Sequence, residues 1–173
     1  MTDLAKTYDP KATEEKIYQR WMDSGYFTPE NLPERHKEPF SIVLPPPNVT
    51  GVLHLGSALM LAIEDIMIRF ERMRGKKTLW VPGTDHAAIA TETKFLKEKK
   101  LSRHDFEGRR EEFLKLVEDF AEENKGIILN QMRAMGASLD WSRLAFTLDE
   151  KRKKAVEKAF MRMNDAGLIY AGE

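Results

Sequence analysis

The strongest constraint on the fold is a stretch in the first third of the chain, where an apolar run meets three prolines and then a helical pattern. The apolar run covers 40–44 and the prolines cover 45–47. Because proline has no N–H for a sheet ladder, we expect the strand to end there. The next helix begins near Gly56, and its first N–H groups point at whatever lies beyond the strand end. His54 stands beside that helix start, which is typical of a phosphate site.

A second strand follows the helix, so the segment is a parallel strand, helix, strand unit. We expect the helix over 56–74, with Gly75 as its end signal, and the second strand over 78–81. The apolar residues at helical spacing are Leu59, Ala62, Ile63, Ile66, Phe70 and Met73. Ligands of such sheets bind beyond the carboxyl ends of the strands, where His54 and Asp85 both fall.

The segments on either side are predicted to be mainly helical. Asp9 predicts a helix start, Gly25 its end, and 28–39 a linker. Beyond Thr91 we expect a long amphipathic helical segment that is interrupted at Gly126. Its apolar face comprises Phe106, Phe113, Val117, Phe120, Ile127 and Met135.

The last part of the chain predicts one more helix and then a strand. Thr147 and Glu150 form a capping-box pair at the helix start, and 168–170 begins the strand. Elsewhere, we expect Trp80 to face the core. His36 and His104 lie in polar surroundings and are expected at the surface.

Composition narrows the class of protein. The chain has 173 residues, 42% of them hydrophobic, which suits a single folded domain. It carries 28 basic and 28 acidic residues, so we do not expect it to form the main nucleic-acid-binding surface. It has no cysteine, hence neither disulfides nor a Cys-containing zinc site. No apolar stretch approaches the roughly 20 residues of a membrane span, and we expect a cytoplasmic location without a membrane partner.

Three stretches, in order, resemble one family. Residues 45–59 are similar to the His-x-Gly-His signature of the class I aminoacyl-tRNA synthetases, and 78–91 and 135–143 resemble two further blocks of its valine-specific members. The resemblance implies an α/β fold, the first half of a Rossmann-like class I synthetase catalytic domain, with parallel strands and flanking helices. It divides the chain into an N-terminal helix and linker, 1–39, and the N-terminal half of the catalytic domain, 40–173, truncated before the editing insertion.

The resemblance also implies an activity. The full family member activates valine with ATP, which carries magnesium, to valyl-adenylate and transfers the valyl group to tRNA(Val). The residues implied for ATP are His54, Gly56 and Ser57, with His54 and Ser57 as the catalytic pair; those implied for the amino acid are Pro46, Pro47, Asn48 and Asp85. The block around Asp140 and Trp141 is given a structural role. The resemblance implies a monomer whose tRNA contacts lie mostly outside this segment.

Several alternatives remain open at these positions. Ser57 stands where the family usually has a second histidine, and it either contacts ATP or caps the helix. Asp85 either binds the amino-acid ammonium group or caps the helix that follows. A metal site formed by Asp85, His86 and Glu92 is a third interpretation of that segment, although its spacing matches no ligand pattern.

Alternatives also remain for the function. The relative could be specific for isoleucine or leucine, or it could be a catalytically inert nucleotide-binding module. The family's Lys-Met-Ser-Lys-Ser loop has no counterpart in this sequence. We therefore expect a fragment that is inactive or very weak on its own.

Overall fold

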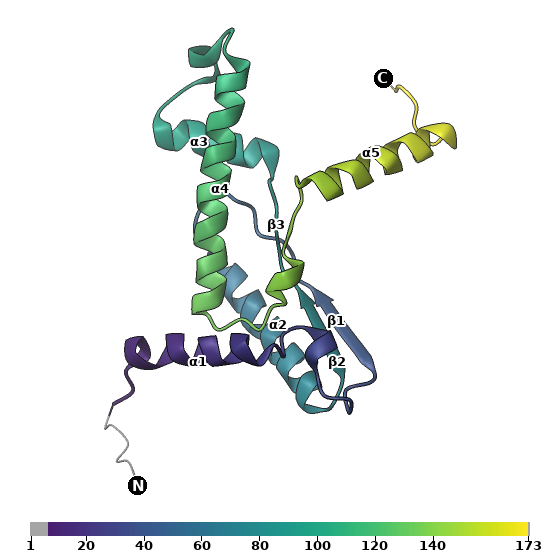
Figure 1. The fold of residues 1–173 in the computed structure, drawn as a ribbon. Helices are drawn as coiled ribbons and strands as arrows, with labels where there is room; N and C mark the ends of the chain where they lie inside the picture. The colour runs from purple at the N-terminus through teal and green to yellow at the C-terminus, as the bar shows by residue number, and fades with distance from the viewer. Residues whose placement is uncertain (1–6, 173) are drawn as a thin grey trace.

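The structure is a computed structural model, and it describes residues 7–172. The helices are α1 (Pro10–Ser24), α2 (Leu55–Met73), α3 (Ala88–Lys99), α4 (Arg110–Ala134) and α5 (Glu150–Asp165). The strands are β1 (Pro39–Val43), β2 (Lys77–Val81), β3 (Gly83–Thr84) and β4 (Ala145–Phe146), and the 3-10 turns are η1 (Pro29–Asn31), η2 (Arg103–Phe106) and η3 (Trp141–Arg143). α4 rises from the layer that holds α2, β1 and β2, and α5 projects to one side (Figure 1).

The predicted strand, helix, strand unit is confirmed. β1 and β2 pair in parallel, with Phe40 opposite Thr78 and Val43 opposite Val81. α2 connects the two strands and packs on both of them. The short strands β3 and β4 form a second parallel pair. The fold is therefore mixed α/β with parallel strands and flanking helices, as expected.

α2 turns a different face to the sheet from the one its apolar spacing predicted. Leu61 and Ile68 are its buried residues, whereas Leu59 and Ile66 are 61% and 67% exposed. α2 is apolar on both sides, so spacing alone did not distinguish them. The sheet side also carries Glu64, whose carboxylate accepts a hydrogen bond of 2.9 Å from the indole of Trp80.

The main core lies between the sheet, α2 and the second half of α4. Trp80 is fully buried there, which confirms its predicted position. Its fully or nearly fully buried neighbours include Leu44, Val49, Ile128, Met132 and Leu139. A second cluster joins α3 to the first half of α4 and comprises Phe95, Phe113, Val117 and Phe120.

α4 runs without a break through Gly126, so the predicted interruption is wrong. A glycine inside a helix costs only about 0.5 to 1 kcal/mol relative to alanine, and the two apolar clusters hold the helix on either side of it. Ile127 and Met135, which were expected on the buried face, are 38% and 43% exposed. Ile128 and Met132 take their place in the core.

α1 begins and ends where its sequence signals predicted. The carboxylate of Asp9 accepts from the N–H of Ala12, and Gly25 ends the helix in the left-handed conformation, with φ of 71°. Tyr18 attaches the helix to the rest of the chain. Its hydroxyl donates to the carbonyl of Ala137 at 3.0 Å and accepts from the indole of Trp141 at 2.8 Å.

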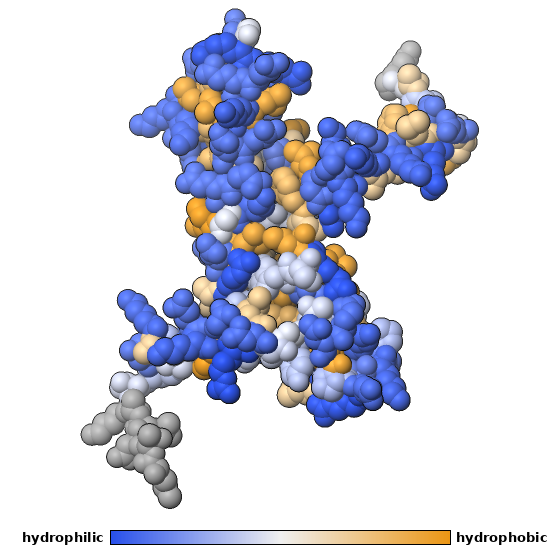
Figure 2. Space-filling model, viewed as in Figure 1, coloured by the Kyte–Doolittle hydropathy of each residue, from blue (hydrophilic) through white to orange (hydrophobic). Residues whose placement is uncertain are grey.

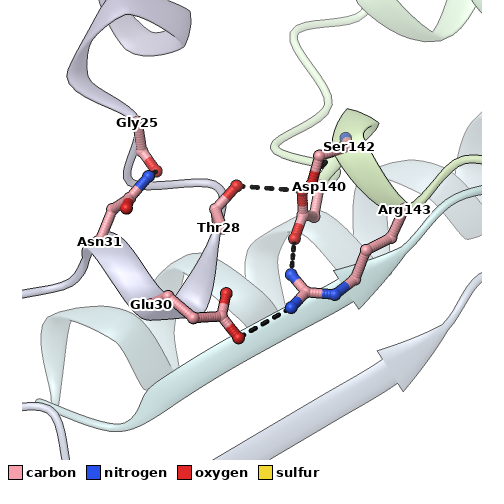
Figure 3. Close-up of polar contacts among 7 residues, drawn as sticks. All are labelled: Gly25, Thr28, Glu30, Asn31, Asp140, Ser142 and Arg143. Atoms are coloured by element: carbon pink, nitrogen blue, oxygen red, sulfur yellow. Dashed lines mark hydrogen bonds and ion pairs between the residues drawn. The ribbon is translucent and has the colours of Figure 1, made fainter.

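Asp140 fastens the segment after α1 to the turn after α4 (Figure 3). Its carboxylate is 1% exposed and accepts from the hydroxyls of Thr28 and Ser142 at 3.0 and 2.6 Å. The guanidinium of Arg143 bonds to Asp140 and also, at 2.7 Å, to Glu30. The structural role expected for this block is confirmed.

His36 is buried, which contradicts its predicted surface position. It is 7% exposed, and its Nδ1 and Nε2 lie 3.0 and 3.1 Å from the carbonyl oxygens of Pro33 and Arg72. The loop after η1 folds back onto the end of α2, a tertiary contact that the local sequence does not reveal. His104 is exposed, as expected.

The C-terminal predictions need two corrections. Asp149, and not Thr147, caps α5, because its carboxylate accepts from the N–H of Arg152. Residues 168–170 form no strand. No residue of α5 is buried, and Val156 and Phe160 are 67% and 57% exposed (Figure 2 shows apolar surface on this helix). A strand needs a neighbour to pair with, and none reaches 168–170 within the described chain.

Candidate active site

The two chain segments that leave β1 and β2 stay side by side beyond the strands. The N–H of Leu44 donates to Val81 at 3.0 Å. Beyond the prolines, the N–H of Asp85 donates to Pro47 at 2.8 Å, and Val49 donates to Asp85 at 2.9 Å. Asn48 is thereby paired with Asp85.

The prolines account for a shift in this pairing. Val43 faces Val81, but Asn48 faces Asp85, so the proline side holds one additional residue between the two pairs. Residues 45–47 have no N–H and cannot donate to the neighbouring segment, although the Pro47 carbonyl still accepts from Asp85. The extra residue lies among these prolines, so it removes no N–H donor from the pairing, and the arrangement resembles a β-bulge.

Pro46 lies next to the start of β3. A Cβ atom added to Gly83 would lie 3.6 Å from Cβ of Pro46 and 3.5 Å from the carbonyl oxygen of Ala145. Pro46 is exposed and Pro47 is half-buried. Among the residues implied for the amino acid, Pro47 and Asp85 are joined by a backbone hydrogen bond, and Asn48 lies opposite Asp85.

His54 caps α2, which corrects the capping role considered for Ser57. Its Nδ1 accepts a hydrogen bond of 3.0 Å from the N–H of Ser57. Nδ1 must be unprotonated to accept, so the neutral ring carries its hydrogen on Nε2. The Ser57 hydroxyl lies 3.2 Å from Nε2 of the same ring. His54 is exposed, so Nε2 can donate to a ligand.

The start of α2 offers further donors. Leu55 and Gly56 hold the first two helical positions, and no hydrogen bond joins their N–H groups to residues 7–172. Such groups, together with the positive end of the helix dipole, favour anions. The loop ahead of His54 is fixed from α4, because Leu53 N–H donates to the side-chain oxygen of Gln131 at 2.8 Å.

Thr147 holds the carboxylate of Asp85 and was missed by the sequence analysis. Its hydroxyl donates to Oδ1 of Asp85 at 2.7 Å and accepts from the N–H of His86 at 2.9 Å. Its own N–H donates to Thr84 at 3.2 Å, extending the β3 and β4 pairing. The capping role considered for Asp85 is wrong, because α3 begins after Ala87 without a side-chain cap.

Two polar atoms beside Asp85 are buried without a partner in the described part of the chain. They are Nδ1 of His86 and the hydroxyl oxygen of Thr84. The His86 ring stands edge-on to Phe146, with 5.9 Å between centroids, and its carbonyl accepts from the Thr91 hydroxyl. Most buried polar atoms in proteins have a hydrogen-bond partner, and a catalytic role is one explanation for those without one.

The structure does not support the metal interpretation. Glu92 is bound to Arg103 rather than grouped with Asp85 and His86. Residues 7–172 contain no group of three or more His, Cys, Asp or Glu side chains placed to hold a metal ion. Within the same residues, no helix is both long enough and apolar enough to span a bilayer.

Comparison with known proteins identifies the family. Residues 16–173 match the tRNA synthetases class I (I, L, M and V). The valine–tRNA ligase of Chlamydia felis is 47% identical over 169 residues, covering 96% of this chain and 18% of the relative. The valine–tRNA ligase of Prochlorococcus marinus is 49% identical over 173 residues, covering 98% of this chain and 18% of the relative. The chain thus spans about a fifth of the length of these relatives.

A solved structure shares the fold. It is the ternary complex of Agrobacterium radiobacter K84 agnB2 LeuRS-tRNA-LeuAMS, with a TM-score of 0.77 and 19% identity. The match covers 95% of this chain and 19% of the LeuRS chain. At that identity the likeness concerns the fold alone, and the family assignment rests on the sequence match. The chain belongs to the class I tRNA synthetases.

Proposed function

We propose that the chain is the first part of the catalytic domain of a valine–tRNA ligase. The complete enzyme would join valine to ATP as valyl-adenylate, release pyrophosphate, and pass the valyl group to tRNA(Val). The choice of valine over leucine or isoleucine rests on relatives named as valine–tRNA ligases that are 45–49% identical over nearly the whole chain. Such an enzyme would work in the cytoplasm as a monomer.

The start of α2 is the proposed ATP site. Nε2 of His54 would donate to a phosphate oxygen, and the N–H groups of Leu55 and Gly56 would donate to oxygens of the same phosphate. Ser57 would add a hydroxyl beside the His54 ring. ATP would bring its magnesium ion with it, held mainly by the phosphates. This arrangement supplies positioning and charge stabilisation, which dominate phosphoryl chemistry.

The edge between Asn48 and Asp85 is the proposed amino-acid site. The carboxylate of Asp85 would pair with the α-ammonium group of valine, and Pro46, Pro47 and Asn48 would shape the wall near its side chain. Thr147 uses Oδ1 of Asp85, which leaves Oδ2 to accept from the ammonium. The valine carboxylate would then attack the α-phosphate of ATP.

We also propose the division of the chain into 1–39 and 40–173. The start of β1 at Pro39 supports a boundary there, while Tyr18 and Asp140 tie the two parts together. The tRNA would bind mostly outside this segment, because the chain covers about a fifth of its relatives.

The observation that carries the proposal is the pairing of Asn48 with Asp85 beyond β1 and β2, near a helix start capped by His54. Calorimetric titration of the chain with ATP and with valine tests it. His54→Ala should weaken ATP binding and leave valine binding unchanged, and Asp85→Asn should do the reverse. Leucine and isoleucine, titrated in parallel, should bind less tightly than valine. Variants that leave both affinities unchanged would remove these residues from the site.

A further inference from the structure

A hollow of about 390 Å³ lies at the opposite end of α2 from His54. α2 has 19 residues, so the two places are separated by roughly 28 Å along the helix. The basic side chains that line the hollow are Arg35, His36, Arg69 and Arg72, and no carboxylate is among its lining residues. The sequence has no net charge, but the lining of this hollow includes three arginines and no acidic residue.

Arg72 is half-buried at the wall of the hollow. Its Nε donates to the Thr78 hydroxyl at 3.0 Å, and its guanidinium lies 5.8 Å from the centre of the Phe27 ring. Nη2 is buried without a partner, and Arg72 forms no ion pair with residues 7–172. Burial, and secondarily the charge of Arg69, lower the pKa of Arg72 to about 10. The guanidinium is thus charged at neutral pH and lacks a counter-ion.

The ring of His36 lies between two carbonyl oxygens at the wall of the hollow. Both of its ring nitrogens face carbonyl oxygens, of Pro33 and of Arg72. The bond to the Arg72 carbonyl also occupies an oxygen at the negative end of α2, where Gly75 N–H donates as well. The helix end therefore opposes an anion less than an uncapped end would.

The nearby carboxylates are already engaged. Asp65 accepts from Arg69 and from the N–H and hydroxyl of Ser138. Glu71 pairs with Arg74 and Lys76. Arg69 is thus neutralised in part, whereas Arg72 has no acidic partner in the described chain.

We propose that this hollow binds a phosphate group. A tetrahedral oxyanion would supply the missing counter-charge for Arg72, and the exposed guanidinium of Arg35 could bind it with paired hydrogen bonds. The volume lies within the range of small-molecule sites, and Tyr26 and Met73 offer apolar walls for the group that carries the phosphate. The site is separate from the proposed ATP site and does not depend on it.

Titration of the chain with inorganic phosphate, at constant ionic strength, tests this assignment. Arg35→Gln and Arg72→Gln should each weaken phosphate binding by about tenfold or more, the order expected for a hydrogen bond between charged groups. Arg110→Gln is the matched control, since it removes the same charge from an exposed position outside the hollow. His54→Ala should leave phosphate binding at the hollow unchanged. A short RNA without terminal phosphates, titrated in a second arm, separates a phosphodiester from a free phosphate as the source.

The outcomes separate the hollow from the other sites. Loss of binding in both arginine variants, with Arg110→Gln and His54→Ala unaffected, supports the assignment. Loss only in His54→Ala would put the phosphate at the start of α2, which overturns the assignment and favours the proposed function. Equal loss in all variants, or no saturable binding of phosphate or RNA, would also overturn it. If Arg72→Gln does not fold, exposed Arg35 decides the question alone.

Discussion

The hydroxyl of Thr147 donates to the Asp85 carboxylate at 2.7 Å, although the two residues are 62 positions apart. The same hydroxyl accepts from the N–H of His86. Thr147 therefore fixes the orientation of the side chain that we expect to hold the amino-acid ammonium group. A carboxylate held in one orientation loses less entropy when it binds a ligand.

Thr147→Val keeps the shape of the side chain but removes its hydrogen bonds. We expect valine affinity to fall by about 1.5 to 3 kcal/mol, the usual contribution of a hydrogen bond to a charged group. Thr147→Ser should restore most of the loss. The measurement is a calorimetric titration with valine and with 2-hydroxy-3-methylbutanoate, which lacks the ammonium group. Equal losses for both ligands would indicate a general structural defect instead of misplacement of Asp85.

The capping geometry at α2 predicts different effects for two neighbouring residues. His54→Ala removes the acceptor for Ser57 N–H and should lower the free energy of unfolding by about 0.5 to 2 kcal/mol. Ser57→Ala leaves that bond intact and should change stability by less than about 0.5 kcal/mol. Urea denaturation of both variants gives the comparison. A larger loss in Ser57→Ala than in His54→Ala would mean that the serine is the cap after all.

Asp140 should be among the residues most sensitive to substitution outside the proposed site. Asp140→Ala deprives Arg143, Thr28 and Ser142 of their shared acceptor (Figure 3). We expect a loss of about 1 to 3 kcal/mol, the usual cost of removing an acceptor that buried donors share, because Arg143 is 36% exposed and keeps Glu30 as a partner. Glu30→Gln, at the exposed end of the same network, should cost only a small fraction of that loss. Thermal unfolding of the two variants tests whether Asp140→Ala lowers the stability more than Glu30→Gln does.

The start of α5 should depend on pH. The N–H of Arg152, which donates to Asp149, lowers the pKa of that carboxyl below its ordinary value of 3.8. A lowered pKa in the folded state means that the capping contribution is complete above about pH 4 and is lost as pH falls through the folded value. Amide exchange of α5 should therefore accelerate in acid. Asp149→Asn, whose side chain also caps but does not titrate there, should show no such acceleration from this source.

The sequence predicted those parts of the molecule that local chemistry decides. The bounds of α1, β1, α2 and β2 followed from caps, prolines and glycines close to the element ends. Burial was harder to predict. α2 is apolar on two sides, and the side that faces the sheet is evident only from tertiary structure, in the burial of Leu61 and Ile68 and the bond between Glu64 and Trp80. His36 was misassigned because its partner, the Arg72 carbonyl, is 36 residues away.

The candidate site was also predictable only where the local sequence determines it. Asn48 and Asp85 each follow a strand, and parallel strands bring their carboxyl ends together. The link to Thr147 requires the pairing of β3 with β4, two strands of two residues each that carry too little pattern to be recognised. The Thr147 and Glu150 pattern pointed to a helix cap, but Asp149 is closer to the helix and takes that role.

We propose that one edge of this chain holds valine at Asp85 and ATP at the start of α2. Backbone amide shifts in a ¹H–¹⁵N NMR titration would locate both ligands on the chain. Valine should shift the signals of Asn48, Asp85 and His86, and ATP those of Leu55, Gly56 and Ser57, each in a saturable way. Shifts confined to other regions, or none for either ligand at millimolar concentration, would contradict the account.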